Sequence, residues 1–296
     1  MHDVFYFTDI HGNYILYDQL INWCLGPDNE AMVIYGGDAC DRGEHGYKIM
    51  RELLDNPQVV YLKGNHEDMF VSAAYAMIGY CAQSDELYEK LHNKSMSRDE
   101  VVSLIISNNN SDITLYMSNG GLPTLTDWIM DGADEDFVAK IESLPLTFKY
   151  ENIDFCHAGA TPEIFKHVYE AEYNGQVNNF FIYSCDVHDI LWNRSVLPLG
   201  WETGRVCVFG HTPTVSLPTG IYGRDQSLAH SKPCAWQDKM GAKDKRGGWK
   251  IDMDTAAVWS EIGYVLNCLT FKVTGFLNEK TDGGSTIKII DEYKII

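Results

Sequence analysis

Short runs of β-branched and aromatic residues recur along the chain and predict buried strands. The five runs are Val4–Phe7, Met32–Tyr35, Val59–Leu62, Ile153–Cys156 and Val206–Phe209. Between the first three runs, apolar residues recur near helical spacing over Tyr14–Leu25 and Gly46–Leu54. This alternation predicts a βαβαβ unit, in which sequential strands run parallel and are joined by right-handed crossovers.

The middle third of the chain, residues 68–145, has a helical pattern instead. Met69–Tyr80 resembles a helix, Ser97–Glu100 is a capping-box signature before an apolar run, and Asp134–Leu144 favours a further helix. We therefore expect one domain over residues 1–296 that carries a helical insertion.

The charge balance limits the possible partners. Lys and Arg number 23 against 42 Asp and Glu, which gives a net charge of −19. Such a charge opposes binding to nucleic acid or to anionic lipid unless a local cationic site overrides it. We expect no nucleic-acid partner, and bound divalent cations would be one such local site.

One stretch, residues 213–250, departs from the acidic composition, with seven basic residues against three acidic ones. Its composition of Gly, Ser, Lys and Pro favours a solvated surface loop over a lid that contacts substrate. Both interpretations stay open on the sequence alone.

The cysteines and the first residues bear on the cellular compartment. The eight cysteines are scattered without a C-x-x-C pair, which favours reduced, mostly buried thiols over a zinc knuckle or a disulfide framework. The chain opens without a charged leader and has no apolar stretch of membrane-spanning length. We expect a soluble, cytoplasmic protein with no membrane association.

Polar residues follow each of the five predicted strands. The clusters are Asp9–Gly12, Asp38–Gly43, Asn65–Glu67, His157–Gly159 and His211–Thr212. In an open α/β sheet, ligands bind outside the carboxyl ends of the strands. We therefore expect these clusters to converge on one site, although they span about two hundred residues of sequence.

The clusters offer oxygen and nitrogen ligands without thiolate. The candidate metal ligands are Asp9, His11, Asp38, Asn65, His157 and His211. This mixed set suits Mn²⁺, Fe or Zn²⁺ better than a structural thiolate zinc site. Six ligands are too many for one catalytic metal with an open position, so we expect two metals, with Asp38 as the candidate bridge.

Two bridged metals would provide hydroxide near neutral pH for in-line attack on phosphorus. Arg42 and Arg194 stand beside these clusters and, with Asn65, are candidates to bind the phosphate oxygens. A leaving alkoxide needs a proton, for which His66 is the candidate general acid, with Asp41 as its orienting carboxylate.

Each motif alone has an ordinary structural explanation. A single His at a strand end is more often a hydrogen-bonded surface residue, either arginine alone is as easily structural, and Asn119-Gly120-Gly121 alone indicates a plain turn. The joint occurrence of six suitable ligand types, each after a strand, favours a catalytic metal site.

The same residues resemble the phosphoprotein phosphatase family of calcineurin-like metallophosphatases. The family pattern GD-x-HG, GD-x-x-DRG, GNHE, H-[GA]-G and GH corresponds here to Thr8–Gly12, Gly37–Gly43, Gly64–Glu67, His157–Gly159 and Gly210-His211. Further runs, Asn119-Gly120-Gly121, Leu191–Arg194 and Phe209–Pro213, look most similar to the bacterial and phage branch typified by bacteriophage lambda protein phosphatase.

This resemblance implies an α/β fold, an αββα sandwich, with a dinuclear site commonly loaded with manganese. By motif, Asp9, His11 and Asp38 would hold the first metal. The second metal would be held by Asp38, Asn65, His157 and His211. The implied activity is metal-dependent phosphomonoester hydrolysis, with a phosphorylated serine or threonine of a protein, or a small phosphoester, as substrate.

The chain departs from the family pattern in three places. Thr8 replaces the usual glycine before the first aspartate, and the basic stretch 213–250 is longer than expected. Ile251–Ala257 resembles the family's late IDTGA strand but has another residue where glycine is usual. These departures leave the local backbone and the substrate rim open.

Two other kinds of function compete with protein dephosphorylation. A dinucleoside polyphosphate hydrolase or a 2′,3′-cyclic nucleotide phosphodiesterase would use the same metal site, although Gly64–Glu67 and Leu191–Arg194 look more like protein phosphatases. A binding scaffold without activity predicts missing ligands, and none is missing. The sequence does not indicate the oligomeric state.

Overall fold

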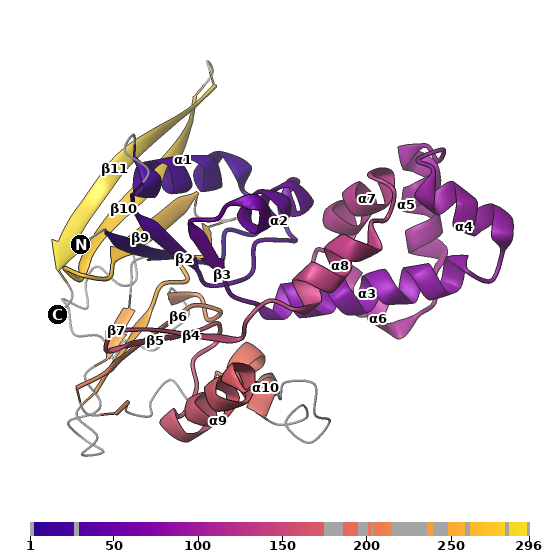
Figure 1. Ribbon diagram of the computed structural model, residues 1–296. Coiled ribbons are helices and arrows are strands. Elements are labelled where there is room, and N and C mark those ends of the chain that lie inside the picture. The colour runs from indigo at the N-terminus through magenta and orange to yellow at the C-terminus, as the bar shows by residue number, and fades with distance from the viewer. Residues whose placement is uncertain are drawn as a thin grey trace.

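The computed structural model stacks two β-sheets face to face, with helices on the outer faces and a separate group of helices to one side (Figure 1). The residues it describes are 3–26, 30–174, 186–194, 201–202, 204–214, 236–238, 248–257, 261–281 and 284–294. This arrangement is the αββα sandwich that the family resemblance implies.

The first sheet contains the predicted βαβαβ unit. Strands β1 (Val4–Phe7), β2 (Met32–Tyr35) and β3 (Val59–Tyr61) pair in parallel, and α1 (Tyr14–Leu25) and α2 (Gly46–Asp55) connect them. The prediction is therefore confirmed almost to the residue. Three antiparallel strands extend the sheet in the order β11-β10-β9-β1-β2-β3, namely β9 (Ile262–Asn267), β10 (Lys272–Thr281) and β11 (Gly284–Lys294).

The other two predicted strands belong to the second sheet, whose order is β4-β5-β6-β8-β7. Its strands are β4 (Thr147–Tyr150), β5 (Ile153–Cys156), β6 (Val206–Phe209), β7 (Trp236–Asp238) and β8 (Trp249–Asp252). Because β5, β6 and β8 run parallel, their carboxyl ends lie at the same edge. The strand-end clusters thus come from two sheets rather than from one open sheet.

Alternation along the strands explains how three apolar layers form. Phe5 and Phe7 of β1 face α1 and α2, whereas Val4 and Tyr6 face the second sheet. The rings of Tyr6 and Phe155 stack 5.5 Å apart between the sheets. A third layer lies under α9 (Pro162–Tyr173) and α10 (Asp186–Trp192) on the far side of the second sheet.

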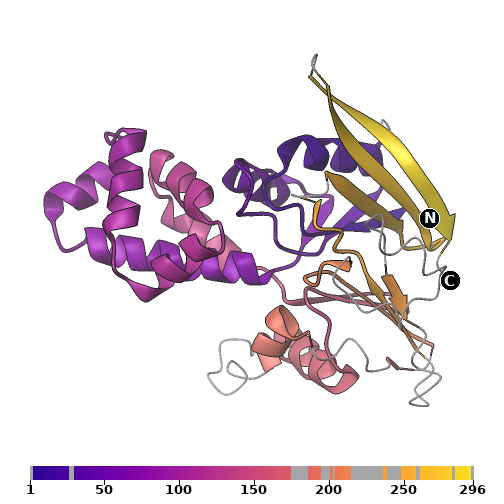
Figure 2. The ribbon, with the colours of Figure 1, turned by 180° about the vertical axis from the view of Figure 1, so that it is seen from behind.

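Six helices lie between β3 and β4 and form a helical lobe away from both termini (Figure 2). They are α3 (Asn65–Cys81), α4 (Asp85–His92), α5 (Arg98–Ser107), α6 (Ser111–Ser118), α7 (Leu122–Met130) and α8 (Glu135–Glu142). The predicted capping box forms at the start of α5, where Ser97 and Glu100 satisfy each other's backbone N–H groups. The helical pattern of the middle third is therefore present.

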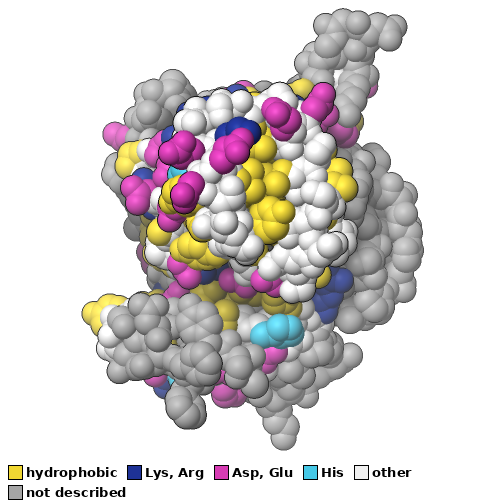
Figure 3. Space-filling model, turned by 90° about the vertical axis from the view of Figure 1, so that its right-hand side faces the viewer, with side chains coloured by type: hydrophobic (Ala, Val, Ile, Leu, Met, Phe, Trp, Pro, Cys, Tyr) yellow, Lys and Arg dark blue, Asp and Glu magenta, His cyan; other side chains and the backbone are white. Residues whose placement is uncertain are grey.

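The helical lobe packs around buried aromatic rings and is braced against α2. Phe70 contacts Tyr116 and Trp128 edge to face. The Tyr47 hydroxyl of α2 donates to Asp131 after α7, at 2.8 Å. Seen from its end, the lobe carries acidic side chains around exposed apolar ones, in keeping with the acidic composition (Figure 3).

Most of the basic stretch 213–250 lies outside the described residues, so the loop and lid interpretations stay predictions. The six described cysteines are buried and carry free thiols, as expected. Among the described residues, no helix has the length and apolar character needed to cross a membrane.

Candidate metal centre

The carboxyl ends of strands from both sheets meet at one buried site. Asp9 and Asp38 follow β1 and β2, Asn65 begins α3 directly after β3, and His157 and His211 follow β5 and β6. All six predicted ligands are buried: Asp9, His11, Asp38, Asn65, His157 and His211. The convergence expected from the sequence therefore occurs.

The loops that carry these residues have an unusual backbone. Six non-glycine residues there have φ between 47° and 71°, in the left-handed region: Asp9, His11, Asp38, Asp41, Arg42 and His211. Such conformations cost on the order of 1–3 kcal/mol each and persist where the surrounding structure enforces them, often at functional sites. Close packing enforces them here, since a Cβ on Gly12 would lie 2.7 Å from the backbone of Gly43.

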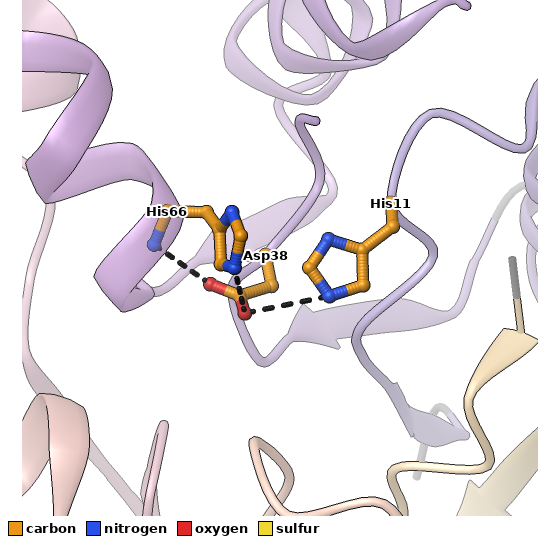
Figure 4. A group of neighbouring side chains, drawn as sticks. All are labelled: His11, Asp38 and His66. Carbon is orange, nitrogen blue, oxygen red and sulfur yellow. Dashed lines mark hydrogen bonds and ion pairs between the residues drawn. The ribbon is translucent and has the colours of Figure 1, made fainter. Parts of the chain in front are cut away.

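Two compact groups of potential ligands share the carboxylate of Asp38. One group is His11, Asp38 and His66, drawn in Figure 4, and the other is Asp38, His157 and His211. In each group the ligand atoms lie within 4.8 Å of one another. A carboxylate common to two groups has the position required of a bridge between two metals.

Asn65 completes the second group. Its side-chain oxygen lies 2.9 Å from His157 Nε2 and 2.9 Å from His211 Nδ1. His157 Nε2 also lies 3.3 Å from Asp38 Oδ1. Two imidazole nitrogens, an amide oxygen and a carboxylate oxygen therefore face one small volume, a donor set that suits Mn²⁺, Fe or Zn²⁺.

The three predicted histidine ligands are oriented as metal ligands are. The second ring nitrogen of each faces a backbone carbonyl: Cys40 for His11 at 2.9 Å, Gly36 for His157 at 2.9 Å, and Trp192 for His211 at 3.2 Å. If that nitrogen carries the proton and donates, the nitrogen facing the centre keeps its lone pair. The residues present therefore fit a divalent metal centre.

Asp9 lies beside the two groups rather than within them. Its carboxylate accepts hydrogen bonds from the Thr8 hydroxyl at 2.6 Å and from the backbone N–H of His211 at 3.1 Å. Thr8, where the family usually has glycine, thus contacts a predicted ligand directly. Burial, with nearby Asp254 and Asp38, raises the pKa of Asp9 well above its usual value.

Sequence reasoning missed two further buried carboxylates, Asp252 and Asp254, at the end of β8. Burial raises the pKa of Asp254 to about 6, and the nearby charge of Asp38 adds to this effect. Burial likewise raises the pKa of Asp252, next to Asp254 and Asp9. So many buried carboxyl groups in one region favour cation binding, because a divalent ion would offset their mutual repulsion.

His66 differs from the other three histidines in the ring nitrogen that faces away from the centre, which contacts a carboxylate rather than a backbone carbonyl. Its Nδ1 lies 2.6 Å from Asp41 Oδ2, and its Nε2 lies 3.8 Å from Asp38 Oδ2. Burial lowers the pKa of His66, but the Asp38 and Asp41 carboxylates outweigh that effect and raise the pKa above its usual value. A raised pKa favours the protonated ring, as a proton donor requires. Burial likewise lowers the pKa of His157, but Asp38 raises it to about 10, so the Asp41 contact rather than the pKa distinguishes His66.

Arg42 and Arg194 approach the centre from the solvent side. The guanidinium of Arg42 lies 2.7 Å from His11 Nε2 and 3.0 Å from His66 Nε2. Arg194 is exposed, and its Nη2 donates to the His211 carbonyl at 3.5 Å. Both arginines predicted to bind phosphate therefore border the histidine cluster.

Glu67, which follows the predicted acid in sequence, holds the backbone around Asp38 through its carboxylate. Its carboxylate accepts from the backbone N–H groups of Asp38, Ala39 and Gly64, each at 2.8 Å. The Tyr61 hydroxyl donates to it as well. Sequence reasoning gave Glu67 no role, and its position in the Gly64–Glu67 motif was the signal that could have indicated one.

Comparison with known proteins gives the following matches. The family model described as calcineurin-like phosphoesterase matches residues 3–251. A protein of Encephalitozoon cuniculi named as a probable serine/threonine-protein phosphatase is 29% identical over 131 residues, which are 41% of this chain and 27% of that protein. The chain thus spans about a quarter of the length of this relative.

Three solved structures resemble the chain over its whole length. A cold-active protein tyrosine phosphatase has a TM-score of 0.47 at 14% identity, covering 98% of this chain and 81% of the other. A protein proposed to be a diadenosine tetraphosphatase has a TM-score of 0.46 at 14% identity, covering 98% and 93%. A serine/threonine phosphatase from Saccharomyces cerevisiae has a TM-score of 0.41 at 13% identity, covering 100% and 80%.

Proposed function

Because this chain belongs to the calcineurin-like phosphoesterase family, we propose that it is a phosphoester hydrolase and that it removes phosphate from monoesters. We infer that its substrates are phosphorylated serine or threonine residues of proteins, as in the phosphoprotein phosphatases. The observation that carries the proposal is the His66–Asp41 pair, which stands apart from three histidines oriented for metal binding.

The metal ligands would divide into two sets around Asp38. Asp9, His11 and Asp38 would hold one ion, and Asp38, Asn65, His157 and His211 would hold the other. Two divalent ions, Mn²⁺ by preference and Fe or Zn²⁺ as alternatives, would neutralise phosphoryl oxygens and make water more acidic. The chain itself holds the ligands in place through the carbonyls behind each imidazole.

The arginines would bind the phosphate oxygens that the ligands leave open. Arg42 lies between His11 and His66, so a phosphate at its guanidinium would sit next to the proton donor. Planar guanidinium groups favour bidentate contacts to phosphate. Arg194 would add a second positive charge from the rim of the site.

His66 would give its proton to the leaving alkoxide. Asp41 holds the ring through Nδ1, which leaves Nε2 facing Arg42 and the Asp38 carboxylate. A serine alkoxide is a far poorer leaving group than an anhydride oxygen, so a dedicated acid contributes most to monoester hydrolysis. This argument favours a phosphomonoester over a dinucleoside polyphosphate. A 2′,3′-cyclic nucleotide also releases an alkoxide, so it remains the second candidate.

The setting proposed for this activity is the cytoplasm. The buried free thiols of the described cysteines suit a reducing compartment. The net charge of −19 disfavours nucleic acid as a partner and fits a phosphoprotein bound through a local cationic site.

The experiment starts from chelator-treated protein reloaded with Mn²⁺. Phosphate release would be compared on a phosphoserine peptide, a phosphotyrosine peptide, diadenosine tetraphosphate and a 2′,3′-cyclic nucleotide. We expect metal-dependent turnover that is fastest on the phosphoserine peptide. His66→Asn should lower that kcat by about 10²–10⁴-fold. Preference for either nucleotide substrate would overturn the substrate assignment, and a fully active His66→Asn enzyme would remove His66 as the acid.

A further inference from the structure

The end of α6 and the start of α7 in the helical lobe contact Asp41, in the loop after β2. The Tyr116 hydroxyl of α6 donates a hydrogen bond to Asp41 Oδ1. The other oxygen of the same carboxylate, Oδ2, contacts His66 Nδ1 at 2.6 Å. Tyr116, Asp41 and His66 therefore form a continuous hydrogen-bonded chain that runs from the lobe to the metal centre.

A second contact from the lobe fixes the backbone of the same aspartate. The N–H of Asp41 donates to Thr124 Oγ1 of α7 at 3.1 Å. Thr124 is fully buried, so no water competes for that hydroxyl. Asp41 has φ of 71°, and a hydrogen bond from its N–H to a fixed partner helps to hold this strained conformation.

The orientation of the Asp41 carboxylate depends on its buried hydrogen-bond partners. Tyr116 and Asp41 are both inaccessible to solvent. A buried carboxylate can rotate about its Cβ–Cγ bond unless both oxygens have partners, and here the tyrosine hydroxyl occupies one of them. Rotation would move Oδ2 away from His66 Nδ1 and release the imidazole from its orientation.

We propose that Tyr116 is a positioning residue for the general acid, and that Thr124 supports it by holding the Asp41 backbone. This inference rests on the proposed role of His66. It assigns part of the reaction to the helical lobe, because Tyr116 lies 75 residues beyond Asp41 in sequence.

The Asn119-Gly120-Gly121 turn has the composition that this arrangement requires. A Cβ on Gly121 would collide with the Tyr116 ring. Gly120 has φ of 92°, and its carbonyl accepts the N–H of Arg42 at 3.0 Å. The turn therefore contacts both the residue that orients the acid and the residue proposed to bind phosphate.

The test uses two substrates that differ in their need for an acid. A phosphoserine peptide releases an alkoxide that must be protonated, whereas p-nitrophenyl phosphate releases a stable phenolate. Tyr116→Phe removes only the hydroxyl that donates to Asp41. We expect kcat on the phosphoserine peptide to fall about tenfold, as for the loss of a hydrogen bond to a charged group. On p-nitrophenyl phosphate we expect a change of less than about twofold, and an unchanged KM on both substrates.

Matched variants separate positioning from general loosening of the lobe. Tyr47→Phe removes the hydroxyl of another buried tyrosine, which donates to Asp131 instead, and should leave the ratio of the two kcat values unchanged. Thr124→Val should reproduce the selective loss on the phosphoserine peptide. Thr124→Ser keeps the hydroxyl and should restore most of that activity.

His66→Asn distinguishes failure of this inference from failure of the proposed function. If His66→Asn is selectively impaired on the phosphoserine peptide but Tyr116→Phe is not, the positioning role is overturned and the acid assignment stands. An equal loss on both substrates in Tyr116→Phe means a structural role only and also overturns the inference. If His66→Asn shows no selective loss, both proposals fail together.

Discussion

The sandwich and the helical lobe contribute different kinds of residue to the same site. The sandwich loops carry the histidines and aspartates that could hold metal, each directly after a strand. Beyond the first turn of α3, the lobe contributes contacts to Asp41 and Arg42 through Tyr116, Gly120 and Thr124. On the proposed function, the sandwich would determine where cations and phosphate bind, and the lobe would determine how His66 and Arg42 are oriented.

The largest effect is expected from removing the Asp38 carboxylate, which both ligand groups of the sandwich share. Asp38→Asn keeps an oxygen that can accept the N–H of His66 but removes the negative charge common to both ligand groups. We expect kcat to fall by on the order of 10³ or more, because charge stabilisation at both groups is weakened. Equilibrium dialysis should find that fewer Mn²⁺ ions are retained per chain.

Asp134→Asn is the control for this change. Asp134 caps α8 in the lobe, and asparagine caps a helix about as well as aspartate. Its metal content and kcat should match those of the wild type. Full metal occupancy and full activity in Asp38→Asn would contradict the role given to the sandwich.

A substitution in the lobe should have a smaller effect and act on substrate binding. In Gly120→Ala the new Cβ would lie 3.0 Å from the Arg42 backbone nitrogen, at a φ of 92°. We expect KM for the phosphoserine peptide to rise about tenfold as Arg42 shifts, corresponding to about 1.4 kcal/mol of lost binding. The backbone strain should also lower the free energy of unfolding by about 1–2 kcal/mol.

Gly204→Ala isolates the strain from the contact. Gly204 also has a positive φ, 78°, but no atom lies within 4 Å of its would-be Cβ. Urea denaturation should show a comparable loss of stability with an unchanged KM. A similar rise in KM in both variants would mean that the Gly120 contact has no specific role.

The smallest expected effect is a gain in stability within the sandwich. Ala256 stands where the family usually has glycine, and its φ of 56° explains that preference. Ala256→Gly relieves about 1–2 kcal/mol of backbone strain and loses about 0.8 kcal/mol of methyl burial. Urea denaturation of the metal-free protein should show a net gain of about 0.5 kcal/mol, and a clear loss would contradict the strain at this position.

Local sequence patterns were sufficient to predict the strands that lead into the site. The runs at β1, β2, β5 and β6 are short and apolar and are bounded by turn residues, so their limits could be predicted. The start of α3 could not, because the metal-ligand motif obscured the fact that Asn65 begins a helix. The pairing of strands into two sheets depends on long-range packing, which residue patterns do not record.

The residues of the site likewise fall into those that the sequence could predict and those that it could not. The candidate ligands could be named because each follows a strand end, and they do converge. Tyr116 and Asp254 were missed because their contacts depend on side chains brought together across long stretches of sequence. Asn119-Gly120-Gly121 forms the expected turn between α6 and α7, and its contact with Arg42 appears only in three dimensions.

The central claim is that two metal ions act together at this site, and the most direct test is a stoichiometric titration. Mn²⁺ would be added stepwise to chelator-treated protein while bound metal and phosphate release from a phosphoserine peptide are measured on the same samples. The account predicts that turnover stays low through the first equivalent and rises as the second ion binds. Full turnover with one ion per chain would contradict it.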